Sequence, residues 1–116
     1  MADPRFEEAG TMAGKSRKQQ IEEMLAEDPN DPFLRYGLAM EYVGAGQEAE
    51  AIRCFEELLR VAPYYVPAYM QAGRALVRLN REEEARTVYR AGITTARQKG
   101  DLHAADEMER FLQELD

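Results

Sequence analysis

The segment Gly10–Ser16, which reads GTMAGKS, has the residue types of a loop that binds a nucleotide phosphate. Such a loop places four residues between its first glycine and the Gly-Lys-Ser group, so that backbone N–H groups can surround the phosphate. This segment has only three, and no strand is expected before it. We therefore assign residues 1–14 to a mobile N-terminal tail and expect no nucleotide or other cofactor.

Side chains that bind metals or act as nucleophiles are scarce. His103 and Cys54 are the only histidine and the only cysteine, and neither has a partner at the spacing of metal ligands. No cysteine–histidine or serine–histidine pair of a nucleophilic enzyme can be assembled from the chain. We interpret Cys54 as a small packing residue and His103 as a solvated side chain near the start of the last helix.

The carboxylates occur in runs, at Glu22-Glu23, Glu56-Glu57 and Glu82–Glu84. These are first-turn or outward-facing positions, where glutamate favours a helix and keeps it soluble. Acid–base catalysis needs two carboxyl groups that converge on a cleft with separated pKa values. The sequence indicates no such pair, so we expect no catalytic residue, no metal site and no enzyme activity.

The overall composition is that of one soluble domain of 116 residues with a modest core. A net charge of −7 disfavours nucleic acid as a partner. No apolar run approaches the roughly 20 residues of a membrane span, and the acidic N-terminus lacks the apolar segment of a secretory signal. A single cysteine allows no internal disulfide. These features favour a cytoplasmic protein with neither a membrane nor a nucleic-acid partner.

Apolar residues recur at spacings of three and four along almost the whole chain, which predicts helices and no strands. Turn residues interrupt this pattern at 27–32, 44–46, 62–67 and 79–83. Asp28 and Ala62 precede prolines and are predicted helix ends, and Asp31 can cap the next helix. The sequence predicts six helices, near residues 15–27, 33–44, 47–61, 66–79, 82–98 and 101–115.

The chain repeats itself at a fixed interval of about 34 residues, the separation of Ile21 from Phe55. FEELLRVAP at Phe55–Pro63 matches IEEMLAEDP at Ile21–Pro29, and the same offset relates further positions downstream. Small residues recur where paired helices would cross closely, and large residues recur where they would fill the space between neighbours. The small set is Ala39, Ala51, Gly73 and Ala85, and the large set is Tyr42, Phe55, Leu76 and Tyr89. A fixed period of this length in paired helices indicates a solenoid.

These positions resemble the pattern of the tetratricopeptide repeat (TPR) family, W-x₂-L-G-x₂-Y…A-x₃-F…P, which has the same period. One copy has Arg35, Leu38-Ala39, Tyr42, Ala51, Phe55 and Pro63; the next has Tyr69, Ala72-Gly73, Leu76, Ala85 and Tyr89, with Arg97 in place of proline. The resemblance implies an all-α fold over residues 15–116, a short right-handed α-solenoid of antiparallel helix pairs. It would contain a half repeat, two full repeats and a capping helix at 101–115, where Ala104, Met108, Phe111 and Leu115 form one apolar stripe.

The resemblance also implies a non-catalytic module that binds another protein, because the first helix of each repeat in this family lines a concave groove. The residues at the groove positions of this chain are Phe33, Tyr36, Met40, Val43, Met70, Arg74, Val77 and Arg78. Helical spacing places the members of each repeat on a shared side of the helix. The alternative is that the large apolar members, Phe33, Met40 and Met70, belong to the core.

Charge along the chain suggests the kind of partner. Residues 66–100 carry seven basic and three acidic side chains between two acidic flanks. Arg74 and Arg78 could hold carboxylates, so we expect a peptide or partner helix with acidic residues beside an apolar anchor. A second possibility is a self-associating module that stacks through its terminal helices. The apolar stripe of the first helix, Ile21, Met24 and Leu25, is narrow, which favours a monomer or a weak homo-oligomer.

Overall fold

The computed structural model describes residues 14–116, which form six helices and no strand. They are α2 (Arg17–Glu27), α3 (Pro32–Gly44), α4 (Glu48–Val61), α5 (Val66–Arg78), α6 (Glu82–Gln98) and α7 (Leu102–Glu114). Each begins and ends within two residues of its predicted position. The predicted tail at 1–14 lies, apart from Gly14, outside the described residues.

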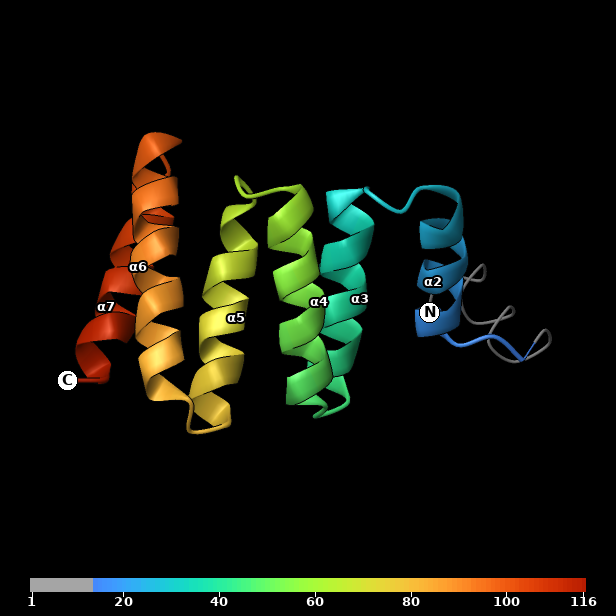
Figure 1. Cartoon of the computed structure of the whole chain (residues 1–116), viewed down its shortest axis with the longest axis horizontal. Coiled ribbons are helices and arrows are strands. Elements are labelled where there is room, and N and C mark those ends of the chain that lie inside the picture. Colours follow the sequence, from blue (N-terminus) through green and yellow to red (C-terminus); the bar gives the residue numbers. More distant parts are fainter. Residues whose placement is uncertain (1–13) are drawn as a thin grey trace, which may run out of the picture.

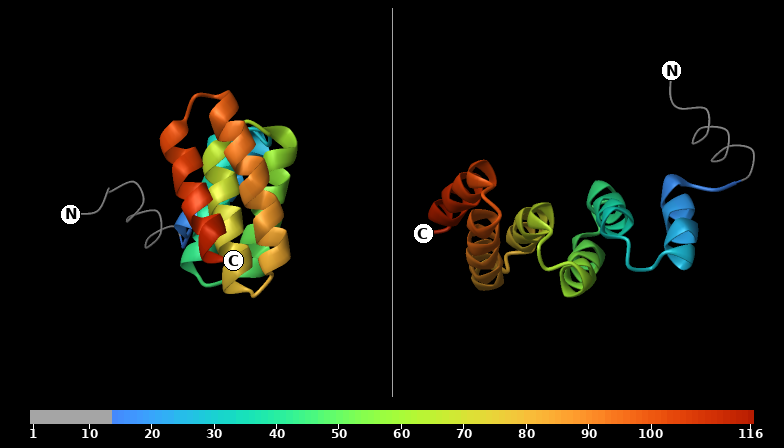
Figure 2. Two further views of the ribbon diagram at one scale, coloured as in Figure 1. Left: turned by 90° about the vertical axis from the view of Figure 1, so that its left-hand side faces the viewer. Right: turned by 90° about the horizontal axis from the view of Figure 1, so that it is seen from above.

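The helices run alternately up and down along the length of the molecule (Figure 1). Viewed from above, α3, α5 and α7 lie in one row and α4 and α6 in the other (Figure 2). Each helix from α3 to α7 packs mainly on its neighbours in the chain, and α5 also touches α7. The result is an elongated body of 48 × 28 × 27 Å, as expected for an array in which each repeat contacts only the next.

Local sequence determines where the helices begin and end. Ser16 caps α2 in a capping box with Gln19, and the Asp31 carboxylate accepts from the backbone N–H groups of Phe33 and Leu34. The turn inside each full repeat needs one left-handed residue. Gly46 supplies it at φ +74° in the first repeat, and Asn80 supplies it at φ +60° at the equivalent position of the second. Glycine and asparagine tolerate this conformation better than other residues, which explains why they share the position.

A second feature recurs with the same period. Nε of Arg35 donates a hydrogen bond to the carbonyl oxygen of Pro29 at 2.6 Å, and Oη of Tyr69 donates one to the carbonyl oxygen of Pro63 at 2.6 Å. Both bonds tie the first helix of a repeat to the proline that closes the preceding segment. Arginine can therefore replace an aromatic residue at position 35, because what this contact requires is a donor on a long side chain.

The core consists of two adjoining clusters. One lies around Ala39, Phe55 and Leu58, and the other around Leu76, Tyr89, Ile93 and Met108. The second cluster extends into α7, which packs closely on α6: a Cβ on Gly92 would lie 2.6 Å from Sδ of Met108. The expected capping stripe is confirmed, with Ala104 and Met108 buried and Phe111 and Leu115 packed against them. In the described part of the chain, no helix is long and apolar enough to cross a membrane.

Candidate functional site

The residues predicted for the groove lie on α3 and α5, the first helices of the two full repeats. Phe33 is 73% exposed and is therefore not part of the core. Tyr36, Met40, Val43, Met70 and Val77 are half-buried, and each packs against one of the two core clusters. Arg74 and Arg78 are exposed. The apolar members thus combine packing with partial exposure, whereas the two arginines lie at the surface.

The first-repeat part of this set is held in place by aromatic contacts. The ring of Tyr36 lies 6.1 Å from that of Phe55 and 5.5 Å from that of Tyr65, centroid to centroid. Burial raises the pKa of the Tyr36 phenol above its ordinary value. Tyr36 is therefore packed into the surface by its aromatic neighbours.

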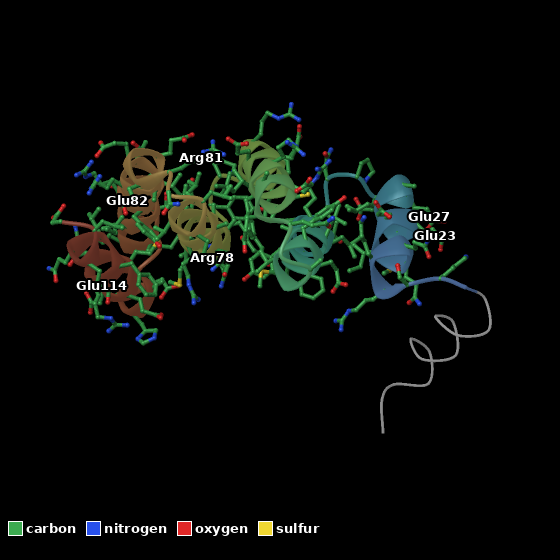
Figure 3. All side chains as sticks on the ribbon, turned by 90° about the horizontal axis from the view of Figure 1, so that it is seen from below. Glu23, Glu27, Arg78, Arg81, Glu82 and Glu114 are labelled. Atoms are coloured by element: carbon green, nitrogen blue, oxygen red, sulfur yellow. The ribbon has the colours of Figure 1, made fainter. Side chains whose placement is uncertain are left out.

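Most second-repeat residues of the predicted groove line a cleft between α5 and α7, called here the α5–α7 cleft. Its volume is about 410 Å³. It is lined by Arg74, Val77, Arg78, Glu82, Tyr89, Phe111, Glu114 and Leu115. Three predicted groove residues, Arg74, Val77 and Arg78, are brought together here. Figure 3 shows Arg78 on α5, Glu82 at the start of α6 and Glu114 on α7.

The two arginines of the cleft have different surroundings. Arg78 binds Glu48 of α4 in bidentate fashion, with Nε–Oε1 at 2.7 Å and Nη2–Oε2 at 3.0 Å. The Glu48 side chain is only 14% exposed, so this pair is well placed to hold the end of α5 against the start of α4. Arg74 forms no ion pair with the carboxylates of residues 14–116, and its guanidinium lies 5.6 Å from the centroid of the Phe111 ring.

Tyr89 forms the inner wall of the cleft and is 2% exposed. Burial raises the pKa of its phenol, and the neighbouring positive charges of Arg74 and Arg78 partly oppose that shift. The phenol is therefore neutral at physiological pH. It contributes a hydroxyl and an aromatic surface, but no charge.

Sequence reasoning missed the contribution of the last helix. Phe111, Glu114 and Leu115 of α7 form the wall that faces α5, although the sequence indicated only a cap. The available signal was the position of α7 as the first helix of a further repeat, which places it in the same row as α3 and α5 (Figure 2). An incomplete third repeat can therefore contribute to the surface formed by the first helices.

The structure also shows how the charges of the basic segment, residues 66–100, are paired. Several of its arginines bind carboxylates of the same chain: Arg81 binds Glu84 at 2.7 Å, and Arg97 binds Glu109 of α7. Arg86 donates to the Leu115 carbonyl oxygen and also binds Glu83. The acidic C-terminal segment thus packs on the basic segment and neutralises part of it. Among the positively charged groups that line the cleft, Arg74 is the one that pairs with no carboxylate of residues 14–116.

A second, smaller cavity of about 200 Å³ lies between α3 and α4, beside Leu38, Tyr42 and Cys54. Cys54 is half-buried, and burial raises the pKa of its thiol. His103 is almost fully exposed, with Nε2 3.6 Å from Glu107. Residues 14–116 contain no group of three or more histidine, cysteine, aspartate or glutamate side chains that could hold a metal ion.

Comparison with known proteins agrees with this architecture. A tetratricopeptide repeat family model matches residues 42–106. A TPR repeat-containing protein of Pseudomonas aeruginosa is 31% identical over 96 residues, which cover 83% of this chain and 91% of that protein.

Two solved structures extend the comparison to the fold. The solution structure of a tetratricopeptide repeat domain protein from Salinibacter ruber superposes with a TM-score of 0.72 at 34% identity, covering 76% of this chain and 89% of that one. A protein from Bordetella parapertussis superposes with a TM-score of 0.76 at 26% identity, covering 87% and 88%.

Proposed function

Because the chain belongs to the tetratricopeptide repeat family, whose members generally act as non-catalytic protein-interaction modules, we propose that it binds a segment of another protein across α3, α5 and α7. The α5–α7 cleft is the anchor site in this proposal. Fold alone does not determine a task in such repeat proteins, so the proposal depends on the side chains of this surface.

The α5–α7 cleft is the single observation that carries the proposal. Its volume is sufficient for one large apolar side chain, and Val77, Phe111 and Leu115 give it apolar walls. Exposed charge surrounds these walls. A centre of apolar contact with a polar rim is the usual arrangement of a protein-binding surface.

The first repeat extends the surface beyond the cleft. Phe33, Tyr36, Met40 and Val43 of α3 and Met70 of α5 are the remaining residues of the proposed site. Phe33 supports this extension because its ring is exposed and gains apolar contact only when a partner covers it. The methionines suit this role, since their flexible side chains adapt to different apolar surfaces.

The partner presents a carboxylate to Arg74 beside an apolar anchor. Arg74 supports this choice because no carboxylate of the described chain neutralises it. Arg78 contributes mainly by positioning α5, since Glu48 already binds its Nε and Nη2. A small interface of this kind corresponds to micromolar binding, about −8 kcal/mol.

Self-association through the terminal helices is the competing proposal, and it has less support. Arg17 of α2 stands one repeat period before Ala51, at a position where close crossings use small residues. A long charged side chain there disfavours the close packing of another helix. A monomer or a weak homo-oligomer is the expected state.

The test is a selection of binding peptides from a random library on the intact protein. Val77→Arg places a long charged side chain in the cleft and should abolish binding of the selected peptides. Thr87→Arg, on the exposed side of α6, is the matched control and should leave binding unchanged. Circular dichroism spectra are used to check that both variants remain helical. Selected peptides that bind Val77→Arg as tightly as the parent protein would contradict the proposal.

A further inference from the structure

The two walls of the α5–α7 cleft carry opposite charges that are not paired with each other. Arg74 lies on α5 and Glu114 on α7, and both side chains are exposed. Neither forms an ion pair with any residue in the described part of the chain. Two other arginines nearby do: Arg78 binds Glu48, and Arg86 binds Glu83 and contacts Glu82 at 3.9 Å. The guanidinium of Arg110 on α7 lies 6.0 Å from the centroid of the Phe111 ring.

The same cleft also has an apolar lining. Val77 stands one turn from Arg74 on α5, and Leu115 follows Glu114 at the end of α7. The ring of Phe111 lies below the Arg74 guanidinium, and Tyr89 forms the inner wall. The cleft therefore combines apolar lining with a cation and an anion, on opposite walls, that form no ion pair within residues 14–116.

We propose that the α5–α7 cleft recognises a protein segment that carries one acidic and one basic residue on either side of an apolar residue. The acidic residue pairs with Arg74, the apolar side chain lies on Phe111, and the basic residue pairs with Glu114. This inference rests on the proposed function and defines its partner class. It differs from a purely acidic ligand, because Glu82 and Glu114 repel a second negative charge in the same cleft.

The opposite charges also determine the direction in which the segment lies. A segment that enters in reverse places its carboxylate beside Glu114 and its cation beside Arg74. Like charges in contact oppose binding, so a given segment binds well in only one direction. The preference for this direction comes as much from the repulsion as from the favourable pairs.

The experiment uses five synthetic peptides and the intact protein. Two carry both charges in opposite orders, acetyl-Asp-Ala-Leu-Ala-Lys-amide and acetyl-Lys-Ala-Leu-Ala-Asp-amide. Two more are derived from whichever of these peptides binds more tightly. One has asparagine in place of aspartate, and the other has glutamine in place of lysine. The fifth, acetyl-Asp-Ala-Leu-Ala-Asp-amide, is doubly acidic. Binding is measured by titration of ¹⁵N and methyl chemical shifts.

We expect the two-signed peptides to bind best, with a loss of roughly two- to fivefold for each charge removed, as for exposed ion pairs. Arg74→Gln should remove the preference for aspartate over asparagine and keep the preference for lysine. Glu114→Gln should remove the preference for lysine over glutamine and keep the preference for aspartate. Both positions are exposed, so both variants should remain folded.

Three results would overturn the inference: tightest binding of the doubly acidic peptide, equal binding of a two-signed peptide and of its asparagine or glutamine analogue, or no shift of cleft residues with any peptide. The proposed function is tested separately by the library selection. Library peptides that depend on Val77 but lack the two-signed pattern would leave the proposed function intact and refute this inference alone.

Discussion

The ring of Tyr89 lies directly against the backbone of Gly73. A Cβ at residue 73 would come within 2.6 Å of Cζ of Tyr89 and still closer to Cε1. The corresponding pair in the preceding repeat is Ala39 and Phe55, both fully buried. The second repeat thus combines the smallest residue with the larger ring, and α5 and α6 approach each other at this point.

Gly73→Ala should destabilise the protein by about 1–3 kcal/mol, because the added methyl group overpacks the crossing with Tyr89. The sign of the change in unfolding free energy is informative, since alanine in place of glycine within a helix would otherwise stabilise the protein by up to about 1 kcal/mol. Urea denaturation followed by circular dichroism measures the change. Gly44→Ala is the control, because a Cβ there meets no atom within 4 Å. Equal stabilisation by both substitutions would refute the close crossing.

Phe55→Ala should cost about 3–5 kcal/mol, because Phe55 is fully buried between α3 and α5 and its removal leaves a cavity. This is a large share of the stability of a domain of this size. Phe33→Ala removes the same side chain from an exposed position on α3 and should change stability by less than about 0.5 kcal/mol. Thermal melts of the two variants compare them directly. Similar melting temperatures would mean that the core assignment is wrong.

The Arg78–Glu48 pair should couple α4 to α5. A double-mutant cycle with Arg78→Gln and Glu48→Gln is expected to give a coupling of about 1 kcal/mol, at the upper end for partly exposed pairs. Added salt should reduce it. Arg74→Gln provides the control, because no carboxylate among residues 14–116 pairs with Arg74. A coupling between residues 74 and 48 as large as that between 78 and 48 would contradict the observed geometry.

Cys54 should react slowly with iodoacetamide in the folded protein. Burial raises the pKa of its thiol, so less thiolate is present at any given pH. The pH dependence of alkylation should therefore move to higher pH in the native protein than in the urea-unfolded chain. Because the chain has one cysteine, mass spectrometry of the intact protein follows the reaction without ambiguity. Coincident pH profiles for the native and unfolded chain would show that the thiol is not shielded.

The fold was predictable because its determinants are local and periodic. Asp31 with Pro32, the prolines at 29 and 63, and Gly100 at φ +75° all mark helix boundaries by their own chemistry. The repeat period then fixes which faces pack together, since the same small and large positions return in each copy.

The site was predictable only in part, because it depends on contacts between helices far apart in the chain. Spacing placed Arg74 and Arg78 on one face. It could not show that Glu48 of the preceding helix binds Arg78, or that α7 brings Phe111 and Glu114 opposite Arg74. Regional charge could not show which arginines are paired within the chain, for example that Arg97 binds Glu109 of the acidic C-terminal helix.

The location of a bound peptide tests the central proposal most directly. A peptide selected from a random library on the intact protein is titrated into ¹⁵N- and methyl-labelled protein, and the shifted residues are mapped on the structure. The proposal predicts the largest shifts at Arg74, Val77, Phe111 and Leu115, with smaller shifts along α3. Largest shifts beside Leu38 and Cys54, or along α4 and α6, would place binding elsewhere and contradict it.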